Sequence, residues 1–467
     1  MKAIKLMDVV KHVGAIDYTA NDRTISVTNV EFDARKIQAG GLFIPLVVGS
    51  PDGHSYIQQA IDNGATATLW SRDQSEAPSD QLAVVFVDDT LEAFQKLAHF
   101  YRNEINPVVI GITGSNGKTT AKDMTASTLK AKYNVHKTEG NYNNEIGLPY
   151  TLLHMPEDTQ VCVVEMGMSG FGEIEQLSKI ARPDIAVITL IGESHLEFLG
   201  SRAGIAQAKL EILKGLKENG IFIYPANEPL IETEMPEIDY PIYMRSFGFD
   251  DQADVFAYDL AEEPDKTYFK TNIDDNVISM IPVIGAYNVS NALVALSIAE
   301  VLDVPSEQAI FQLAQFKLTA NRLQWLKTHQ GARLLNDAYN ASPTSMNAVL
   351  TTLSNIELEG VDRKIAVLGD IRELGNMSEQ LHRELSHSID PTIIDKVYLF
   401  GSQMTYLYDE LKGKFAAEDL VHIEADHAEL IATLQADILA TDVLLVKSSF
   451  GVDLLQVVTA LTGQVTK

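Results

Sequence analysis

The sequence predicts an α/β protein of three domains whose sheets are mostly parallel. Its 467 residues are enough for about three domains of ordinary size. Short apolar runs alternate with amphipathic stretches of helical length, which is typical of parallel strands joined by helices. This alternation starts again after residue 316. We therefore expect domains over residues 1–105, 106–316 and 317–467.

The N-terminal domain is expected to be a small α/β unit. An apolar run over residues 83–87 predicts a strand. Leu91, Phe94, Leu97 and Tyr101 then follow at helical spacing and predict a helix. Residues 103–107, which end in Asn-Pro, are interpreted as a linker to the next domain.

The central domain is predicted from a strand over residues 108–112, a glycine-rich loop and a helix over residues 118–132. Two more apolar runs, 161–164 and 185–191, end in polar residues, Glu165 in the first and Glu193 to His195 in the second. The carboxyl ends of parallel strands form the ligand crevice of an open sheet. Both polar clusters are therefore expected to face the loop. Helices over residues 288–302 and 306–316 close the domain.

The C-terminal domain is expected to be Rossmann-like. Apolar runs at 333–335, 365–368, 397–400 and 443–446 predict strands with helical stretches between them. Ser342 and Pro343 supply an N-cap and a first helical residue for one of these helices.

Composition excludes several classes of function. No apolar run reaches the roughly 18 residues of a membrane-spanning helix. A single cysteine, Cys162, rules out a disulfide framework and a zinc cluster, so a reducing cytoplasm fits best. The net charge of -28 opposes binding to nucleic acid or anionic lipid. Any phosphate must therefore be held by local groups.

Residues 111–120, GITGSNGKTT, predict a nucleoside triphosphate site, although the general phosphate-loop pattern has glycine where Ile112 stands. The glycines allow the backbone to wrap a phosphate, and the helix N-terminus adds its dipole. Lys118 is expected to reach the terminal phosphates, and Thr119 offers a hydroxyl to Mg²⁺. The predicted nucleotide-binding residues of the loop are Gly114, Ser115, Asn116, Gly117, Lys118, Thr119 and Thr120.

Other polar residues are ambiguous when they are judged from local pattern alone. Glu165 suits a metal-directed carboxylate at a strand end, or one that faces water. His195 suits a ligand or a structural histidine, and Lys209 resembles part of a solvated helix face. Asn141, Asn143 and Asn144 suit either a polar ligand or a turn-rich connection.

Several segments together resemble the Mur ligases. Residues 113–120 satisfy the family's loop T-G-[ST]-x-G-K-[ST]-[ST], so Ile112 marks this family's tighter loop. Residues 138–149 resemble T-x-G-N-x-N-N-x-x-G-x-P. Residues 367–375 resemble V-L-G-D-M-x-E-L-G, and residues 336–343 are similar to N-D-x-Y-N-A-[NS]-P. These motifs are most similar to the MurF type, and the matches run from about residue 31 to 449.

The resemblance implies roles for the ambiguous residues. It implies ATP and two Mg²⁺ ions as cofactors, with Lys118, Glu165, His195 and a carbamylated Lys209 as catalytic residues. Thr119, Glu165, His195 and Lys209 would be the metal ligands, because a carbamate supplies hard anionic oxygens where an ammonium would repel the ion. Asn291 would contact adenine, Arg322 the ATP phosphates and Asp337 the ribose.

The resemblance also implies the substrates, UDP-N-acetylmuramoyl-tripeptide and D-alanyl-D-alanine, and a monomeric enzyme. The first domain would bind the UDP-sugar, and the third would bind D-alanyl-D-alanine. Substrate-binding roles are implied for Asp33, Arg35, Asn141, Asn143, Asn144, Tyr339, Asn340, Lys447 and Ser448.

The chain departs from the family pattern at four places. Ala34 stands where Ser or Thr is usual, which removes one hydroxyl from the UDP site. Tyr287 replaces a histidine, and Asn321 replaces a glycine before Arg322. Residues 448–450, Ser-Ser-Phe, replace Gly-Ser-Arg after Lys447.

The expected reaction is ATP-dependent amide formation through an acyl phosphate, with the C-terminal domain closing over the site to exclude water. A sister alternative is a folylpolyglutamate synthase, which shares the loop and the carbamylated lysine. The asparagine segment and the UDP-type first domain argue against it. An alternative from another class is a P-loop switch or motor ATPase, but no water-positioning residue or partner surface is identified in the sequence.

Overall fold

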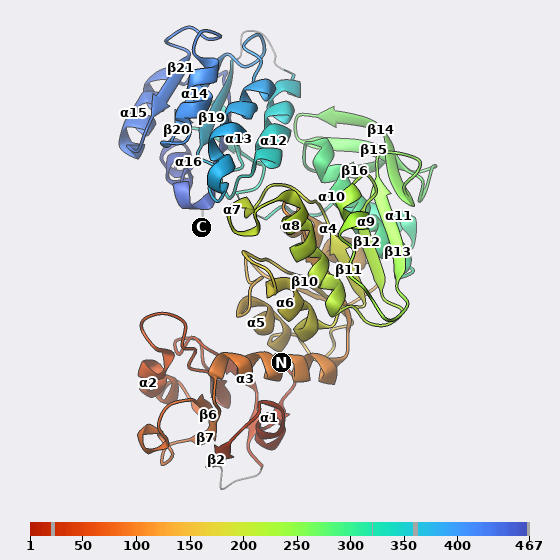
Figure 1. Ribbon diagram of the computed structural model, residues 1–467, viewed down its shortest axis with the longest axis vertical. Coiled ribbons are helices and arrows are strands. Elements are labelled where there is room, and N and C mark those ends of the chain that lie inside the picture. The colour runs from red at the N-terminus through yellow and green to blue at the C-terminus, as the bar shows by residue number, and fades with distance from the viewer. Residues whose placement is uncertain (20–23, 320, 358–362, 465–467) are drawn as a thin grey trace.

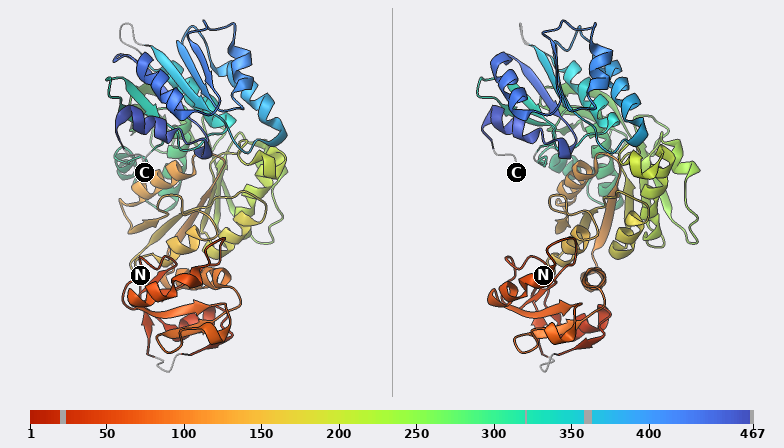
Figure 2. Two further views of the ribbon diagram at one scale, coloured as in Figure 1. Left: turned by 90° about the vertical axis from the view of Figure 1, so that its left-hand side faces the viewer. Right: turned by 60° about the vertical axis from the view of Figure 1, so that its left-hand side comes forward.

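The computed structural model describes residues 1–467 except 20–23, 320, 358–362 and 465–467. Three α/β blocks follow one another along the chain, and Figures 1 and 2 show the N-terminal block at one end, the C-terminal block at the other and the central block between them. Most neighbouring strands of the large sheets are parallel, as the alternating pattern predicts. No helix within the described ranges is long and apolar enough to cross a membrane.

The N-terminal block contains, in the described residues, a sheet in the order β2-β7-β6-β5-β4 and a separate β1-β3 pair. The longest helix, α3, begins at the N-cap Asp89 and buries Phe94, Leu97 and Tyr101. The bounds are β1 Ile4–Lys5, α1 Leu6–His12, β2 Asp17–Tyr18, β3 Ser26–Val27, β4 Asn29–Glu31, β5 Gly41–Phe43, α2 Ile57–Asp62, β6 Ala65–Trp70, β7 Ala83–Phe86 and α3 Thr90–Ile105.

The predicted linker over residues 103–107 is wrong in part, because α3 continues through Ile105. Asn106 ends the helix in the left-handed region at φ 51°, which asparagine tolerates better than most residues. Only Asn106 and Pro107 separate the helix from the first strand of the central sheet.

The central block is built on a sheet in the order β16-β15-β14-β13-β12-β11-β8-β10-β9. Strands β9 to β14 are mutually parallel, whereas β14, β15 and β16 pair antiparallel. The bounds are β8 Val108–Thr113, α4 Lys118–Leu129, β9 Val135–Lys137, α5 Gly147–Leu153, β10 Val161–Glu165, α6 Glu173–Ala181, β11 Ile185–Ile188, α7 Leu196–Leu199, α8 Arg202–Leu210, β12 Ile221–Pro225, α9 Pro229–Thr233, β13 Tyr243–Gly248, β14 Val255–Glu263, β15 Lys266–Thr271, β16 Ser279–Ile281, α10 Ala286–Val301 and α11 Ser306–Leu313.

Alternate residues of the central strands enter two different cores. Ile110 and Ile112 of β8 pack in one core with residues of α4 and α10. Val109 packs in the other core, which contains residues of α3, α5 and α6. Both faces of the sheet are therefore covered, which explains why its parallel strands read as continuous apolar runs in the sequence.

The C-terminal block has a sheet in the order β17-β18-β22-β19-β20-β21, in which only β17 is antiparallel to its neighbour among the described strands. Ser342 is the N-cap of helix α12 and Pro343 its first residue, as the Ser-Pro pair predicts, and Ser342 forms a capping box with Ser345. The bounds are β17 Gln324–Lys327, β18 Arg333–Asn336, α12 Pro343–Asn355, β19 Lys364–Gly369, α13 Ser378–Glu384, β20 Lys396–Phe400, α14 Thr405–Leu411, β21 Leu420–Ile423, α15 His427–Asp437, β22 Val443–Lys447 and α16 Leu455–Thr462.

One buried arginine joins the N-terminal block to the central one. Arg102 of α3 is 1% exposed and donates from Nε to the Ala181 carbonyl (2.8 Å) and from a terminal nitrogen to the Arg182 carbonyl (3.1 Å). These carbonyls end helix α6, where a cation also interacts favourably with the helix dipole.

We expect Arg102→Met to lower the free energy of unfolding by about 2–4 kcal/mol, because the helix-end carbonyls lose buried donors. Urea titration followed by circular dichroism measures this change. The control is Lys96→Met on the same helix, whose exposed pair with Glu92 is worth about 0.5 kcal/mol or less. Equal effects of the two substitutions would contradict the structural role of Arg102.

Candidate active site

The phosphate loop lies between the end of β8 and the start of α4. Gly114 has φ 150°, and a Cβ there would lie 1.9 Å from the hydroxyl oxygen of Thr189. Gly117 has φ 83° and precedes the first helical residue, Lys118. Ile112 is fully buried within β8, paired with Glu165 of β10 and Val187 of β11. The loop therefore begins after the position where the general pattern has its first glycine.

The segment that follows β11 is hydrogen-bonded to this loop. The Ser115 amide donates to the Leu190 carbonyl (2.8 Å), and the Ser115 hydroxyl accepts from the Gly192 amide (2.9 Å). The Ser194 hydroxyl donates to the Ser115 carbonyl at 3.3 Å. These bonds hold the polar residues 193–195 beside the loop, as the sequence pattern predicts.

A cavity of about 130 Å³ lies against the loop and the C-terminal block. It brings together most of the residues predicted for nucleotide binding: Ser115, Asn116, Gly117, Lys118, Thr119, Thr120, Asn291, Arg322 and Asp337. Tyr339, Asn340 and Lys447 also line it, whereas Gly114 and Ser448 do not. Lining residues that the sequence reasoning did not assign include Asn288, Leu318, Leu323, Thr344, Ser345 and Ala348.

Besides Lys447, two cationic side chains line this cavity, Lys118 and Arg322. Lys118 donates to the Gly114 carbonyl (2.7 Å), and burial lowers the pKa of its ammonium. The Arg322 guanidinium lies over the Tyr339 ring, 4.5 Å from its centroid. Its buried Nε has no hydrogen-bond partner among the described residues. Both groups are therefore suited to anionic oxygens.

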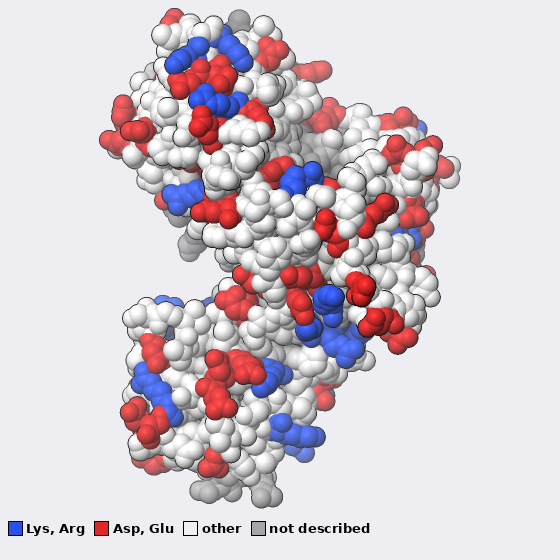
Figure 3. All heavy atoms as spheres, in the orientation of Figure 1, with Lys and Arg blue, Asp and Glu red and all other residues white. Residues whose placement is uncertain are grey.

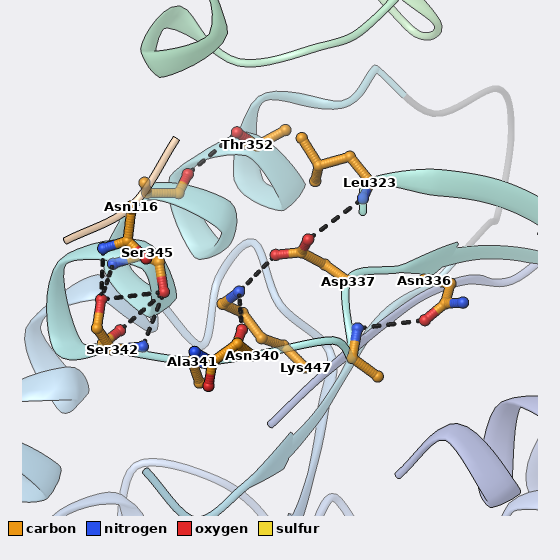
Figure 4. A network of polar contacts seen from close by, with 12 residues as sticks. Asn116, Leu323, Asn336, Asp337, Asn340, Ala341, Ser342, Ser345, Thr352 and Lys447 are labelled. Atoms are coloured by element: carbon orange, nitrogen blue, oxygen red, sulfur yellow. Dashed lines mark hydrogen bonds and ion pairs between the residues drawn. The ribbon is translucent and has the colours of Figure 1, made fainter. Parts of the chain in front are cut away.

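Asp337 is already engaged within the C-terminal block (Figure 4). One carboxylate oxygen accepts from Lys447, and the other accepts from the Leu323 amide (3.2 Å). Lys447 also donates to the Asn340 carbonyl (2.9 Å). A ribose contact by Asp337 would have to share or replace these bonds.

A second cavity, of about 670 Å³, adjoins the loop near the end of β10. Glu165 is 2% exposed, and its two oxygens accept from the Thr119 hydroxyl (2.9 Å) and the Asn143 amide (2.8 Å). The predicted residues Asn141, Asn144 and His195 line the same cavity. Residues that the sequence reasoning did not single out also line it, namely Glu145, Gly167, Met168, Ser169, Glu173, Gln176 and Leu177.

The predicted metal ligands are only partly assembled. Thr119 and Glu165 offer adjacent oxygen donors of the kind that Mg²⁺ prefers. Across the described ranges, however, no group of three or more His, Cys, Asp and Glu side chains is placed to hold a metal ion. His195 lies at the cavity wall and is bonded through Nδ1 to Glu373 of the C-terminal block (2.6 Å). That hydrogen bond holds the pKa of Glu373 below its usual value.

Lys209 does not line either cavity but lies buried near Lys118. Its side chain is in α8 and is 1% exposed. Burial, followed by repulsion from Lys118, lowers the pKa of the Lys209 amine well below its usual value. Burial therefore favours the neutral amine over the ammonium, and Lys209 is not part of a solvated helix face.

The predicted UDP residues lie apart, in the N-terminal block. Asp33 and Arg35 pair with each other at 2.8 Å, and neither lines the two cavities described above. Ala34 is buried, and its carbonyl accepts from Asn63 at 2.8 Å. In space-filling view the molecule is hollowed between this block and the C-terminal one (Figure 3).

The other departures from the family pattern have local explanations. Asn321 has φ 65°, the left-handed region in which glycine and asparagine are favoured, so it fits where the pattern has glycine. Tyr287 lines the nucleotide cavity, and burial raises the pKa of its hydroxyl. Ser448 is buried, and Phe450 is exposed with its ring 5.8 Å from that of Tyr339.

Comparisons with known proteins agree with this architecture. Three family descriptions match in chain order: "Mur ligase family, catalytic domain" over residues 26–102, "Mur ligase middle domain" over 112–299, and "Mur ligase, glutamate ligase domain" over 321–450. The order and spacing of these matches confirm the three-domain α/β architecture.

Individual relatives cover nearly the whole chain. The UDP-N-acetylmuramoyl-tripeptide–D-alanyl-D-alanine ligase of Bacillus subtilis is 42% identical over 432 residues, 92% of each chain. A crystal structure of MurF from Acinetobacter baumannii matches with a TM-score of 0.86 and 27% identity, over 99% of this chain and 100% of that one. MurF of Thermotoga maritima in complex with ADP matches with a TM-score of 0.79 and 27% identity, over 92% and 96%. The chain thus belongs to the Mur ligase family.

Proposed function

We propose that this protein is an ATP-dependent ligase that joins D-alanyl-D-alanine to UDP-N-acetylmuramoyl-tripeptide in the cytoplasm, a step of peptidoglycan precursor synthesis. One observation carries the proposal. The nucleotide cavity and the larger cavity share Lys118, Thr119, Arg322, Tyr339 and Asn340. The terminal phosphate of ATP would therefore sit where a second substrate has room beside it.

This arrangement favours a ligase over a switch or motor ATPase. Hydrolysis alone needs space for one water molecule, about 10–15 Å³ when volume is measured as for these cavities. The larger cavity is far bigger, and the amide side chains of Asn141, Asn143 and Asn144 offer donors and acceptors to a peptide. The three named domains of the family and the relatives described above support the same reaction.

We assign one substrate to each domain. Residues 1–105 would hold the UDP-sugar through Asp33 and Arg35, and residues 106–316 would hold ATP, with Asn291 at adenine. Residues 317–467 would hold D-alanyl-D-alanine, with Arg322 reaching the ATP phosphates and Asp337 the ribose. The remaining contacts of the third domain with substrate would come from Tyr339, Asn340, Lys447 and Ser448.

In the first step a carboxylate oxygen of the tripeptide attacks the γ-phosphorus of ATP. An oxygen–phosphorus bond forms, the bond from phosphorus to the β,γ-bridging oxygen breaks, and ADP leaves. Lys118 and Arg322 would offset the negative charge on the transferring group. Amide donors such as that of Asn143 would orient the reacting carboxylate.

Magnesium ions, when bound, would neutralise phosphate charge and align the reacting oxygens. Thr119 and Glu165 fit one such ion, since their oxygens are adjacent and hard. His195 would bind Mg²⁺ together with Glu165, and the oxygens of a carbamylated Lys209 would face a second ion. A neutral buried amine can attack CO2, forming a nitrogen–carbon bond and releasing a proton, which converts Lys209 from a potential cation into an anionic oxygen donor.

In the second step the free amine of D-alanyl-D-alanine attacks the carbonyl carbon of the acyl phosphate. The tetrahedral intermediate then loses inorganic phosphate and a proton to leave the new amide. Water would also destroy the acyl phosphate, so the C-terminal domain has to cover the site during the reaction. We expect the enzyme to act as a monomer.

The first test of this function is an omission assay. We expect phosphate release only when ATP, UDP-N-acetylmuramoyl-tripeptide and D-alanyl-D-alanine are all present, with one pentapeptide formed per phosphate. Coupled phosphate detection and mass spectrometry of the product measure the two quantities. Release that persists without either co-substrate would point to an ATPase, and product formed with a folate substrate would point to the sister ligases.

The second test concerns the loop lysine. We expect Lys118→Ala to lower kcat by about 10²–10³-fold, because a charge that stabilises the transferring phosphoryl group is lost. The matched control is Lys130→Ala at the exposed C-terminal end of the same helix, with activity near that of the wild type. Comparable losses in both variants would argue against a direct role for Lys118.

The third test concerns the modification of Lys209. We expect a carbamate carbon signal in the NMR spectrum of protein equilibrated with ¹³C-bicarbonate, absent from Lys209→Ala and present in the control Lys214→Ala. Lys209→Ala should lose activity by at least about 10²-fold and regain part of it with short carboxylic acids, which replace the anionic oxygens. An unchanged spectrum together with no rescue would refute the carbamate.

A further inference from the structure

A side chain of the C-terminal domain holds the candidate metal ligand of the central domain. His195 precedes helix α7, and its Nδ1 lies 2.6 Å from Oε2 of Glu373, which follows β19. A backbone hydrogen bond joins the same two segments, because the Glu197 amide donates to the Glu373 carbonyl at 2.9 Å. Two bonds therefore join the same short segments of two domains.

Both residues have a backbone conformation that is costly outside glycine. His195 has φ 63° and Glu373 has φ 64°, each in the left-handed region. Such conformations persist where the surroundings impose them, and they cluster at functional sites. At Gly375, also left-handed, an added Cβ would lie 3.2 Å from the Glu197 backbone. The loop that carries Glu373 is thus pressed closely against α7.

The hydrogen bond determines which ring nitrogen is free. An ionised carboxylate only accepts hydrogen bonds, so Nδ1 of His195 must carry the hydrogen. The neutral ring then keeps its lone pair on Nε2, the form that ligates metals. His195 also lines the larger cavity, whose other lining residues include Lys118, Thr119 and Glu165.

We propose that Glu373 is a positioning residue, which holds His195 in the tautomer and orientation needed to bind a metal ion at the phosphate loop. Because Glu373 belongs to the C-terminal domain, the metal site is complete only when that domain is docked. This inference rests on the proposed function for the identity of the site, but it concerns metal binding rather than ligation.

Two further contacts agree with docking at this place. The Asn116 amide of the phosphate loop donates to the Ser342 hydroxyl (2.8 Å). Thr344, also on α12, donates through its hydroxyl to Glu193. Among these three side-chain contacts, only that of Glu373 reaches a residue that lines the larger cavity. Glu373 is therefore the contact suited to couple domain position to the metal rather than to the nucleotide.

The experiment measures Mn²⁺ binding to the full chain in the presence of ADP, by electron paramagnetic resonance of the free ion. We expect Glu373→Ala to raise the Kd for Mn²⁺ by about 10–100-fold, the usual cost of losing the group that orients a ligating histidine. Glu373→Gln, whose amide oxygen still accepts from Nδ1, should lose less than about tenfold. The matched control is Glu379→Ala, an exposed carboxylate of the same domain that pairs with Arg383.

A double substitution distinguishes positioning from a general structural effect. In the His195→Ala background, Glu373→Ala should cause no further loss of Mn²⁺ affinity. An additive loss, or wild-type affinity in Glu373→Ala, would overturn the proposal. Binding is measured without tripeptide or dipeptide, so a failed omission assay would refute the ligase function while leaving this result interpretable.

Discussion

The site depends above all on the position of β8 between β10 and β11. Parallel pairing in register sets Ile112 beside Glu165 on one side and Val187 on the other, so all three strands end at the same level. The phosphate loop leaves β8 at that level, with Glu165 on one flank and the segment that carries His195 on the other. Because these strands are buried on both faces, their register is fixed by packing as well as by hydrogen bonds.

Much of this arrangement could be predicted from sequence because it depends on local pattern. Glycine at positions 114 and 117 indicates backbone conformations with positive φ. An apolar run that ends in Glu165 indicates the end of a buried strand. The pairing of Glu165 with Thr119 follows from the rule that ligands meet at the carboxyl ends of strands. The strands within residues 243–281 could not be predicted in this way. Strands β13 to β16 are partly exposed, and β14 to β16 pair antiparallel, so their sequences lack continuous apolar runs.

Other parts of the site depend on tertiary structure that local pattern does not contain. Glu373 lay within a recognised motif, yet nothing near it in the chain indicates that it faces a histidine 178 residues away. The sequence shows only that Asn321 replaces the glycine of the family pattern. The structure shows that its backbone is left-handed, a conformation that asparagine tolerates. Lys209 resembled a solvated helical lysine, because the pattern of α8 does not reveal that its polar side chain is buried near Lys118.

The surroundings of Lys118 and Lys209 suggest how so acidic a chain would bind a polyanionic substrate. At a net charge of -28 the overall field repels ATP, so attraction must come from cations at the loop itself. Burial makes the charged form of Lys118 costly while the site holds no anion, and this lowers its pKa. Phosphate oxygens reverse that balance, because they stabilise the ammonium in surroundings where water screens little. For Lys209, burial and then repulsion from Lys118 lower the pKa of the amine and favour its neutral form, which the proposed carbamate requires. Under the proposed function, this pair of lysines would supply a cation for the nucleotide and, after carbamylation of Lys209, an anion for the metal.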